Sequence, residues 1–198
     1  MLGNLRALFR YRGLIQTLVA RELKARYRGS VLGFFWSFVN PLLLLLVYTF
    51  VFSVILQGFR PVDIEPYALF LFCGLLPWTW FSSALTESAN ALLANGNLIK
   101  KVLFPAEVLP VVAVVANMVH FFLALPILLV GLAFFATGAP GLAEVIWFPL
   151  LIAVQFVLTL ALGLMLAALT VHFRDIKDLL ANVLTLWFFA TPILYPMS

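Results

Sequence analysis

Five apolar runs divide this chain, and they constrain its fold more than any other feature of the sequence. The runs cover about 34–56, 67–91, 109–135, 145–171 and 179–194. Each of the first four is longer than the roughly 20 residues that a helix needs to cross the hydrocarbon core of a bilayer. The fifth is short for a simple span, because Pro192 and Pro196 interrupt it. Since 65% of the 198 residues are hydrophobic and only 10% are charged, we predict an all-α polytopic membrane protein.

The charged residues predict how these runs are oriented. Residues 1–33 form a basic, amphipathic cytosolic lead, and we expect one transmembrane domain over 34–198. With the N-terminus in the cytosol, only Arg60 of the 12 Lys and Arg residues falls in an external loop. Cytosolic loops carry an excess of basic residues, so we predict a multi-pass protein of the cytoplasmic (inner) membrane with a cytosolic N-terminus. This asymmetry also explains the net charge of +4, and we expect no nucleic-acid partner.

The lead ends in a segment with helical periodicity. Apolar residues at four-residue spacing line one face of a helix predicted over 14–28: Ile15, Val19, Leu23 and Tyr27. We predict an interfacial helix along the cytosolic leaflet, with these charged residues: Arg21, Glu22, Lys24 and Arg28. Arg26 falls at the edge of the apolar stripe and would have to snorkel, while Leu14 and Leu18 stray toward the basic side. A plain juxtamembrane linker is the alternative.

The sequence carries no pattern for nucleotide hydrolysis or metal binding. It lacks a GxxxxGK[ST] phosphate-binding loop, and no metal-ligand cluster or catalytic set of residues is recognisable. His120 is the one ionisable group near the middle of a predicted span, and Asn117 precedes it by one turn on the same face. We interpret this polar site as an interhelical hydrogen bond; a site on a translocation path or for a proton is the alternative.

Two cytosolic loops carry further patterns. The segment 95–105, NGNLIKKVLFP, has a helix-capable centre at Leu98–Phe104, in which apolar residues surround two lysines. A simple connector would not need so many apolar side chains, so we interpret it as a docking element; contact with the membrane surface is the alternative. In the second loop, 172–178, Arg174 and Asp175 could pair with each other or with a partner subunit. The alternative is that these two residues cap a helix and help to set the orientation of the spans in the membrane.

These motifs resemble the membrane subunit of ABC-2 type exporters, in the branch that exports polysaccharides such as O-antigen, capsule or teichoic acid. The similar segments, in chain order, are RELKARYRGSVLGFFWSFVNP, GLLPWTWFSSAL, NGNLIKKVLFP, FRDI and TPILYP. They extend over about Leu14–Pro196. Family members continue into re-entrant helices and a sixth span, so we expect five of the six spans here. The chain that stops at Ser198 is then either a fragment or a truncated product.

The resemblance implies a permease subunit and not an enzyme. The expected partners are a second copy of the permease, a separate ABC ATPase and the surrounding membrane lipid. ATP and Mg²⁺ would bind to the ATPase, so no cofactor is expected on this chain. The expected cargo is a polyprenyl-linked polysaccharide that moves outward. The alternatives are a permease for a small hydrophobic drug or lipid, and a non-transporting truncated fragment.

The resemblance also implies roles for particular residues. The segment 95–105 is similar to the family's coupling helix, which fits a groove in the ATPase. The expected coupling residues are Leu98, Ile99, Lys100, Lys101, Val102, Leu103, Phe104, Arg174 and Asp175. Sugar rings present apolar C–H faces that stack on aromatic rings, and the expected translocation path is lined by Trp36, Trp78, Trp80 and Phe81. For each of these aromatic residues, contact with lipid or with the membrane interface is the alternative.

Overall fold

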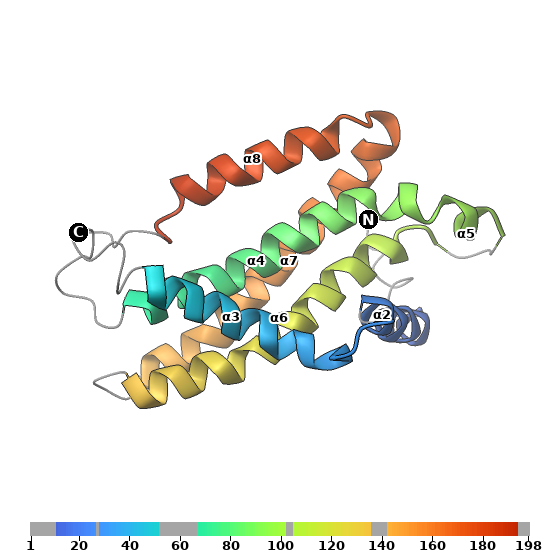
Figure 1. Ribbon diagram of the computed structural model, residues 1–198. Helices are drawn as coiled ribbons and strands as arrows, with labels where there is room; N and C mark the ends of the chain where they lie inside the picture. Colours follow the sequence, from blue (N-terminus) through green and yellow to red (C-terminus); the bar gives the residue numbers. More distant parts are fainter. Residues whose placement is uncertain (1–10, 27, 52–66, 102–104, 136–141, 194–198) are drawn as a thin grey trace.

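The computed structural model describes residues 11–26, 28–51, 67–101, 105–135 and 142–193. These ranges are helical and contain no strand, which confirms the all-α prediction (Figure 1). Three long helices run side by side: α4 (Tyr67–Ala94), α6 (Val108–Phe135) and α7 (Leu142–His172). The central helix is α4, which contacts both α6 and α7 extensively.

Among the described residues, these three helices are the ones that are long and apolar enough to cross a membrane. The spanning stretches are Tyr67–Ala94, Val108–Phe134 and Ile146–His172. The first predicted run begins with a 3-10 turn, η1 (Gly33–Phe35), and continues as α3 (Trp36–Phe50). Its predicted continuation over 52–56 lies outside the described residues. The last predicted run forms α8 (Ile176–Ala190), which has 15 residues and stops before Pro192, as the proline predicts.

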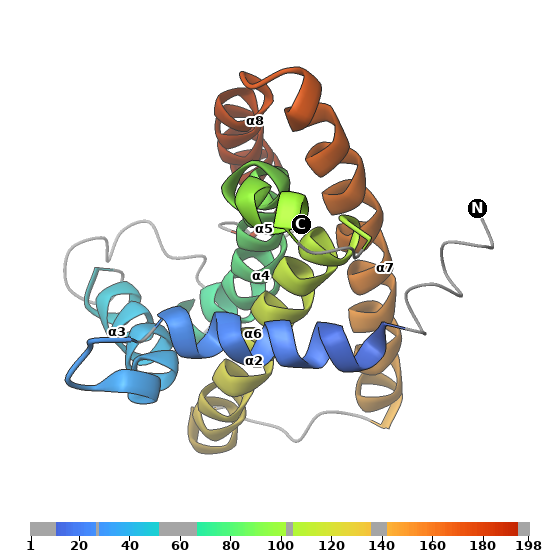
Figure 2. The same cartoon turned by 90° about the vertical axis from the view of Figure 1, so that its right-hand side faces the viewer.

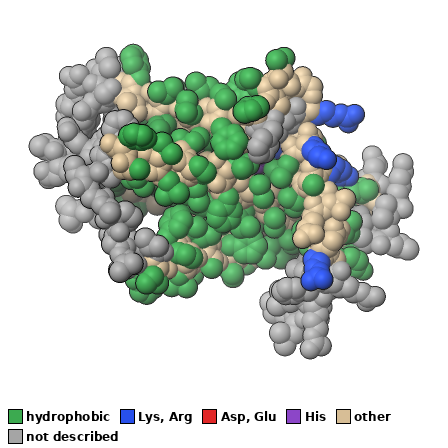
Figure 3. Space-filling view, turned by 90° about the horizontal axis from the view of Figure 1, so that it is seen from below, with side chains coloured by type: hydrophobic (Ala, Val, Ile, Leu, Met, Phe, Trp, Pro, Cys, Tyr) green, Lys and Arg blue, Asp and Glu red, His purple; other side chains and the backbone are tan. Residues whose placement is uncertain are grey.

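Two further helices lie at one end of the bundle. Helix α2 (Arg12–Arg26) crosses this end at a steep angle to the long helices, and α5 (Gly96–Lys101) lies at the same end (Figures 1 and 2). Figure 3 shows apolar side chains along the length of the bundle and Lys and Arg side chains at this end. This separation of apolar from basic side chains is expected of a membrane protein, because basic residues are enriched in the loops at one end of its spans.

Helix α2 forms where a helix was predicted, but its buried face is displaced. Leu18 and Val19 are its buried residues, and they pack against Val108, Val112 and Ala116 of α6. The sequence placed Leu18 toward the basic side, whereas the structure buries it to 8% exposure. The cause is packing between helices. The valine and alanine side chains of α6 leave room for both Leu18 and Val19, so the buried face of α2 is centred between these two residues. Tyr27, predicted on the apolar face, lies outside the described residues.

Close packing at small residues and two internal hydrogen bonds hold α4 against its neighbours. A Cβ atom added at Gly163 of α7 would lie 2.9 Å from Ser88 Oγ, so the helices could not approach this closely with a larger residue. The Ser88 hydroxyl donates to the Pro110 carbonyl at 3.3 Å. The amide of Gln155 on α7 donates to the carbonyl of Pro77 on α4 at 2.7 Å. These two hydrogen bonds pair polar groups of α4 with groups at α6 and α7.

Candidate functional site

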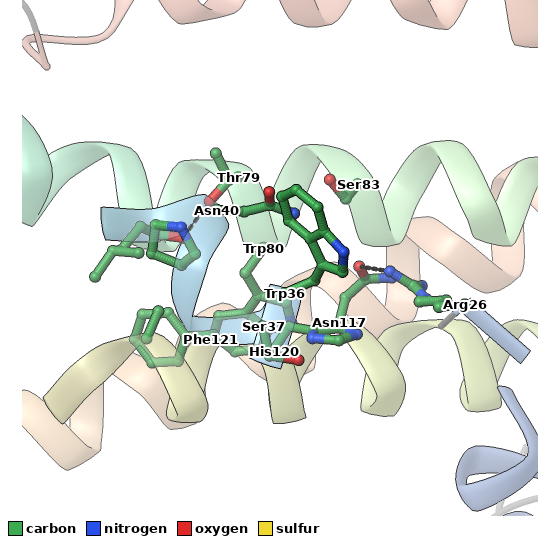
Figure 4. Close-up of a pocket in the computed structure, with 13 residues that line it drawn as sticks. Arg26, Trp36, Ser37, Asn40, Thr79, Trp80, Ser83, Asn117, His120 and Phe121 are labelled. Atoms are coloured by element: carbon green, nitrogen blue, oxygen red, sulfur yellow. Dashed lines mark hydrogen bonds between the residues drawn. The ribbon is translucent and has the colours of Figure 1, made fainter. Parts of the chain in front are cut away.

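A cavity of about 220 Å³ lies between α3, α4 and α6 (Figure 4). Its walls combine aromatic rings with polar side chains, among them Trp36, Asn40, Thr79, Trp80, Ser83 and His120. All three helices come from one subunit. A cavity of this mixed character is notable inside an apolar bundle, because uncompensated polar groups at membrane depth are costly.

Two of the four aromatic residues predicted for a path meet at this cavity. Trp80 is 3% exposed and stacks on Phe121 of α6, with ring centroids 5.2 Å apart. Its indole N–H is buried and has no hydrogen-bond partner in the part of the chain that the structure describes. Trp36 lies at the start of α3, and its indole N–H donates to Ser30 Oγ at 2.8 Å. This hydrogen bond fixes the ring at the side of the cavity.

The other two aromatic residues, Trp78 and Phe81, lie against α8. The rings of Trp78 and Phe188 have centroids 5.6 Å apart, and those of Phe81 and Trp187 are 5.2 Å apart. Adjacent helical residues are about 100° apart, so Trp78 and Trp80 point in directions about 200° apart. The structure therefore separates the predicted path residues: Trp36 and Trp80 line the cavity, whereas Trp78 and Phe81 contribute to the contact between α4 and α8.

A stripe of exposed polar side chains continues from the cavity toward the end of α4 that leads into α5. Its members are separated by four, three and four residues, which places them on one helix face: Thr79, Ser83, Thr86 and Asn90. The hydroxyls of Thr79 and Thr86 donate to backbone carbonyls of their own helix, at 2.9 Å each. Their oxygen lone pairs remain able to accept. Sequence reasoning missed this stripe, although its helical spacing was a readable signal.

A polar network connects α2 with α4 and α6 at the side of the cavity nearest α2. Arg26 of α2 forms an ion pair with Glu87 of α4. Asn117 of α6 donates to Glu87 Oε2 at 2.7 Å and accepts from Arg26 at 3.4 Å. Asn117 is 4% exposed and also donates to the Ala113 carbonyl at 2.9 Å. Asn117 thus makes an interhelical hydrogen bond of the predicted kind, while His120 lines the cavity.

The predicted coupling residues that the structure describes lie at the end of the bundle that carries α2. A short helix, α5, forms within 95–105, and the backbone N–H groups of Leu98 and Ile99 donate to the Asn95 carbonyl at 2.9 and 3.1 Å. Leu98 and Ile99 are half-buried, and Lys100 and Lys101 end the helix. Val102, Leu103 and Phe104 lie outside the described residues.

The second predicted coupling loop joins α7 to α8 at the same end of the bundle (Figure 1). Arg174 and Asp175 are both exposed there, beside Phe173 with 64% of its surface accessible. Asp175 precedes the first residue of α8, and its side chain makes no capping hydrogen bond. Helix capping therefore does not account for this carboxylate. Arg21, Lys24 and Arg28 are likewise exposed, while Glu22 is half-buried.

The described groups around the cavity and at the end that carries α2 are suited to contact with a ligand or a partner. Among the described residues, no group of three or more His, Cys, Asp or Glu side chains is arranged to hold a metal ion. The polar stripe and the cavity offer hydroxyl, amide and aromatic groups to a neutral polar ligand. The exposed basic and apolar groups at the end that carries α2 offer a surface to a partner.

The chain is similar to known permeases over nearly all of its length. Residues 13–198 match the family model for ABC-2 type transporters. The O-antigen export system permease protein RfbA of Myxococcus xanthus is 48% identical over 100% of this chain, which covers 74% of that protein. A protein of the same name from Klebsiella pneumoniae is 35% identical over 92% of this chain and 68% of its own length. The polysialic acid transport protein KpsM of Escherichia coli is 24% identical over 92% of this chain and 70% of its own length.

Proposed function

Because this chain belongs to the ABC-2 type transporter family, we propose that it is the membrane-spanning permease subunit of an ATP-driven exporter of lipid-linked polysaccharide. The observation that carries the proposal is the cavity of aromatic and polar side chains within the spans, in a chain 48% identical to an O-antigen export permease. A transporter for a small hydrophobic drug or lipid would be expected to present a mainly apolar surface to its cargo. The polar stripe on α4 therefore favours a saccharide.

The path for the cargo follows the polar face of α4. Ser, Thr and Asn side chains on that face can exchange hydrogen bonds with sugar hydroxyls, and Trp36 can stack on the apolar side of a sugar ring. Polar residues of membrane helices usually face the interior of a bundle or a water-filled space. We place a second copy of the permease opposite this face, so that two stripes enclose the path.

The energy for transport comes from a separate ABC ATPase, which binds ATP and Mg²⁺. The permease contributes the docking surface, formed by α5 and the loop before α8. Export then proceeds outward across the cytoplasmic membrane, with this end of the bundle in the cytosol and membrane lipid around the apolar surface. The basic residues at this end support the orientation.

The orientation predicts which positions react with a reagent that cannot cross the membrane. In a Cys73→Ser background, a cysteine within 58–65 should be labelled by an external maleimide in intact cells. A cysteine placed at Asn97 should be labelled only after the cells are permeabilised. Labelling at Asn97 in intact cells would show that the orientation is reversed. Recovery of the signal on lysis serves as the control for thiol reactivity.

Removal of the Trp36 ring should slow export without disturbing assembly. Trp36→Ala eliminates one stacking surface beside the cavity, and the loss of such a contact corresponds to about tenfold in rate. Trp36→Phe keeps an aromatic face and should retain most of the activity. Export is measured as lipid-linked polysaccharide reaching the outside of vesicles, with co-purification of the ATPase as the test of assembly.

The matched control for this experiment is Trp147→Ala. Trp147 lies on α7 and is 59% exposed, away from the residues that line the cavity. Its loss should leave export unchanged, because a lipid-facing indole contributes no contact to the cargo. Normal export by Trp36→Ala, or an equal fall for both variants, would contradict the proposed path.

A further inference from the structure

We propose that the network of Arg26, Glu87 and Asn117 couples the position of α2 to the cavity, with Arg26 as the positioning residue. This inference rests on the proposed function, because it describes how movement of the cytosolic helix would reach the path. Each of the three side chains comes from a different helix. The network therefore responds to displacement of any one helix relative to the other two.

The other contacts of α2 do not fix its position in the same way. Its apolar side chains Leu18 and Val19 pack on Val108, Val112 and Ala116 of α6. Apolar packing is non-directional, so this face allows α2 to slide or roll at modest cost. The ion pair and its hydrogen bonds depend on direction and distance. Arg26, in the last turn of α2, therefore fixes the position of α2 along α4 and α6.

The acidic member of the network requires a cation from elsewhere. Glu87 is the only charged residue of α4, and α6 contains none. A lysine one turn away on α4 would neutralise Glu87 independently of any other helix. Instead the cation comes from α2, 61 residues away in sequence. Compensation of a carboxylate inside a span therefore depends on where α2 lies, which is the property that a coupling element needs.

The network also borders the cavity. Arg26 and Asn117 are both among its lining residues, and Figure 4 shows the Arg26 side chain reaching from α2 to Asn117. Asn117 is one turn from His120 and Phe121, which line the same cavity. A shift of α2 that breaks the ion pair would leave Glu87 and Asn117 without Arg26 at the cytosolic side of the cavity. The arrangement of polar groups available to the cargo then changes with the position of α2.

The test compares export with ATP hydrolysis in the full-length permease–ATPase complex in proteoliposomes. Arg26→Gln, Glu87→Gln and the double variant should each assemble and hydrolyse ATP, while export per ATP falls by about tenfold. The exchanged pair Arg26→Glu with Glu87→Arg should recover most of the loss, and Arg26→Lys should recover part of it. A residue that only stabilised the fold would lower assembly and hydrolysis as well.

Neighbouring charges on α2 and just beyond its end provide the matched controls. Lys24→Gln and Arg28→Gln remove one positive charge each from exposed positions that do not line the cavity. Both should leave export per ATP unchanged. Normal coupling in the doubly neutral variant would overturn the proposal, because it would show that the pair serves only to cancel a charge. An equal loss in the Lys24 or Arg28 variant would also overturn it.

A distance measurement tests, without any cargo, whether the network fixes the position of α2. Spin labels at Arg21→Cys on α2 and Val171→Cys on α7, both exposed, report the separation of the two helices in a Cys73→Ser background. Glu87→Gln should broaden the distance distribution, and Lys24→Gln should not. An unchanged distribution in Glu87→Gln would overturn the coupling role even if export per ATP falls in that variant. Absence of polysaccharide export by the wild-type complex would instead refute the proposed function, and this measurement would still decide the inference.

Discussion

Replacing Gly163 with leucine should prevent the helical bundle from assembling in its native packing. A Cβ at this position would lie 2.9 Å from Ser88 Oγ, 3.1 Å from Ser88 Cβ and 3.4 Å from Val114 Cγ2. Ser88 and Val114 are both fully buried, so neither side chain has space into which it can move. Overpacking of a close-packed interior costs about 1–3 kcal/mol, and we expect the leucine variant to reach about 3 kcal/mol. The measurement is thermal stability of the detergent-purified protein.

The same contact offers its own controls. Gly163→Ala adds the Cβ alone and should lose less stability, and Ser88→Ala in that background should restore part of it by removing the hydroxyl. Gly13→Leu makes the larger change at a site on α2 with no atom within 4 Å of the added Cβ, and it should be tolerated. A Gly163→Leu protein as stable as Gly13→Leu would mean that α4 and α7 are not in the close contact described.

Truncation of Phe104 should weaken the complex with the ATPase by about thirtyfold, corresponding to about 2 kcal/mol at the centre of an interface. The prediction comes from the sequence, in which Phe104 is the last residue of an apolar cluster in a loop predicted to be cytosolic. Phe104→Ala should still insert in the membrane. It should co-purify poorly with the ATPase and lose transport-coupled hydrolysis, because a buried aromatic anchor is missing from the contact.

A matched truncation at the other end of the molecule controls for general effects of losing a phenyl ring. Phe134 is 79% exposed near the end of α6, at the far side of the bundle from α5. Phe134→Ala should leave association with the ATPase unchanged. Undiminished co-purification and coupling in Phe104→Ala would favour the alternative in which the loop rests on anionic lipid.

The helices themselves were predictable because their cause is local. Long uncharged runs must form helices in a bilayer, where every backbone polar group needs an internal partner. The rotation of each helix was less predictable, because it depends on which neighbours accept it. Trp78 and Trp80 looked equivalent in the sequence, yet Trp78 meets the rings of α8 and Trp80 meets Phe121 of α6. Leu18 of α2 was misplaced for the same reason.

The polar network could not be derived from spacing, since Arg26, Glu87 and Asn117 are separated by 61 and 30 residues in sequence. One part of it did leave a signal. Arg26 disturbed the amphipathic pattern of its helix, and a charge on the edge of an apolar face requires a partner. The sequence showed that such a partner was needed, and only the fold shows that Glu87 supplies it.

The tilt of helix α7 should depend on the thickness of the bilayer. The spanning stretch of α7 has 27 residues, or about 40 Å against a hydrocarbon core of about 30 Å, and only 17% of an 18-residue segment within it is buried. A helix with this mismatch tilts, or the surrounding lipid stretches to meet it. Through Gly163 and Gln155, α7 is fastened to α4, and a change in its tilt moves the polar stripe of α4 as well. The length of the acyl chains in the membrane thereby sets the resting inclination of the proposed path.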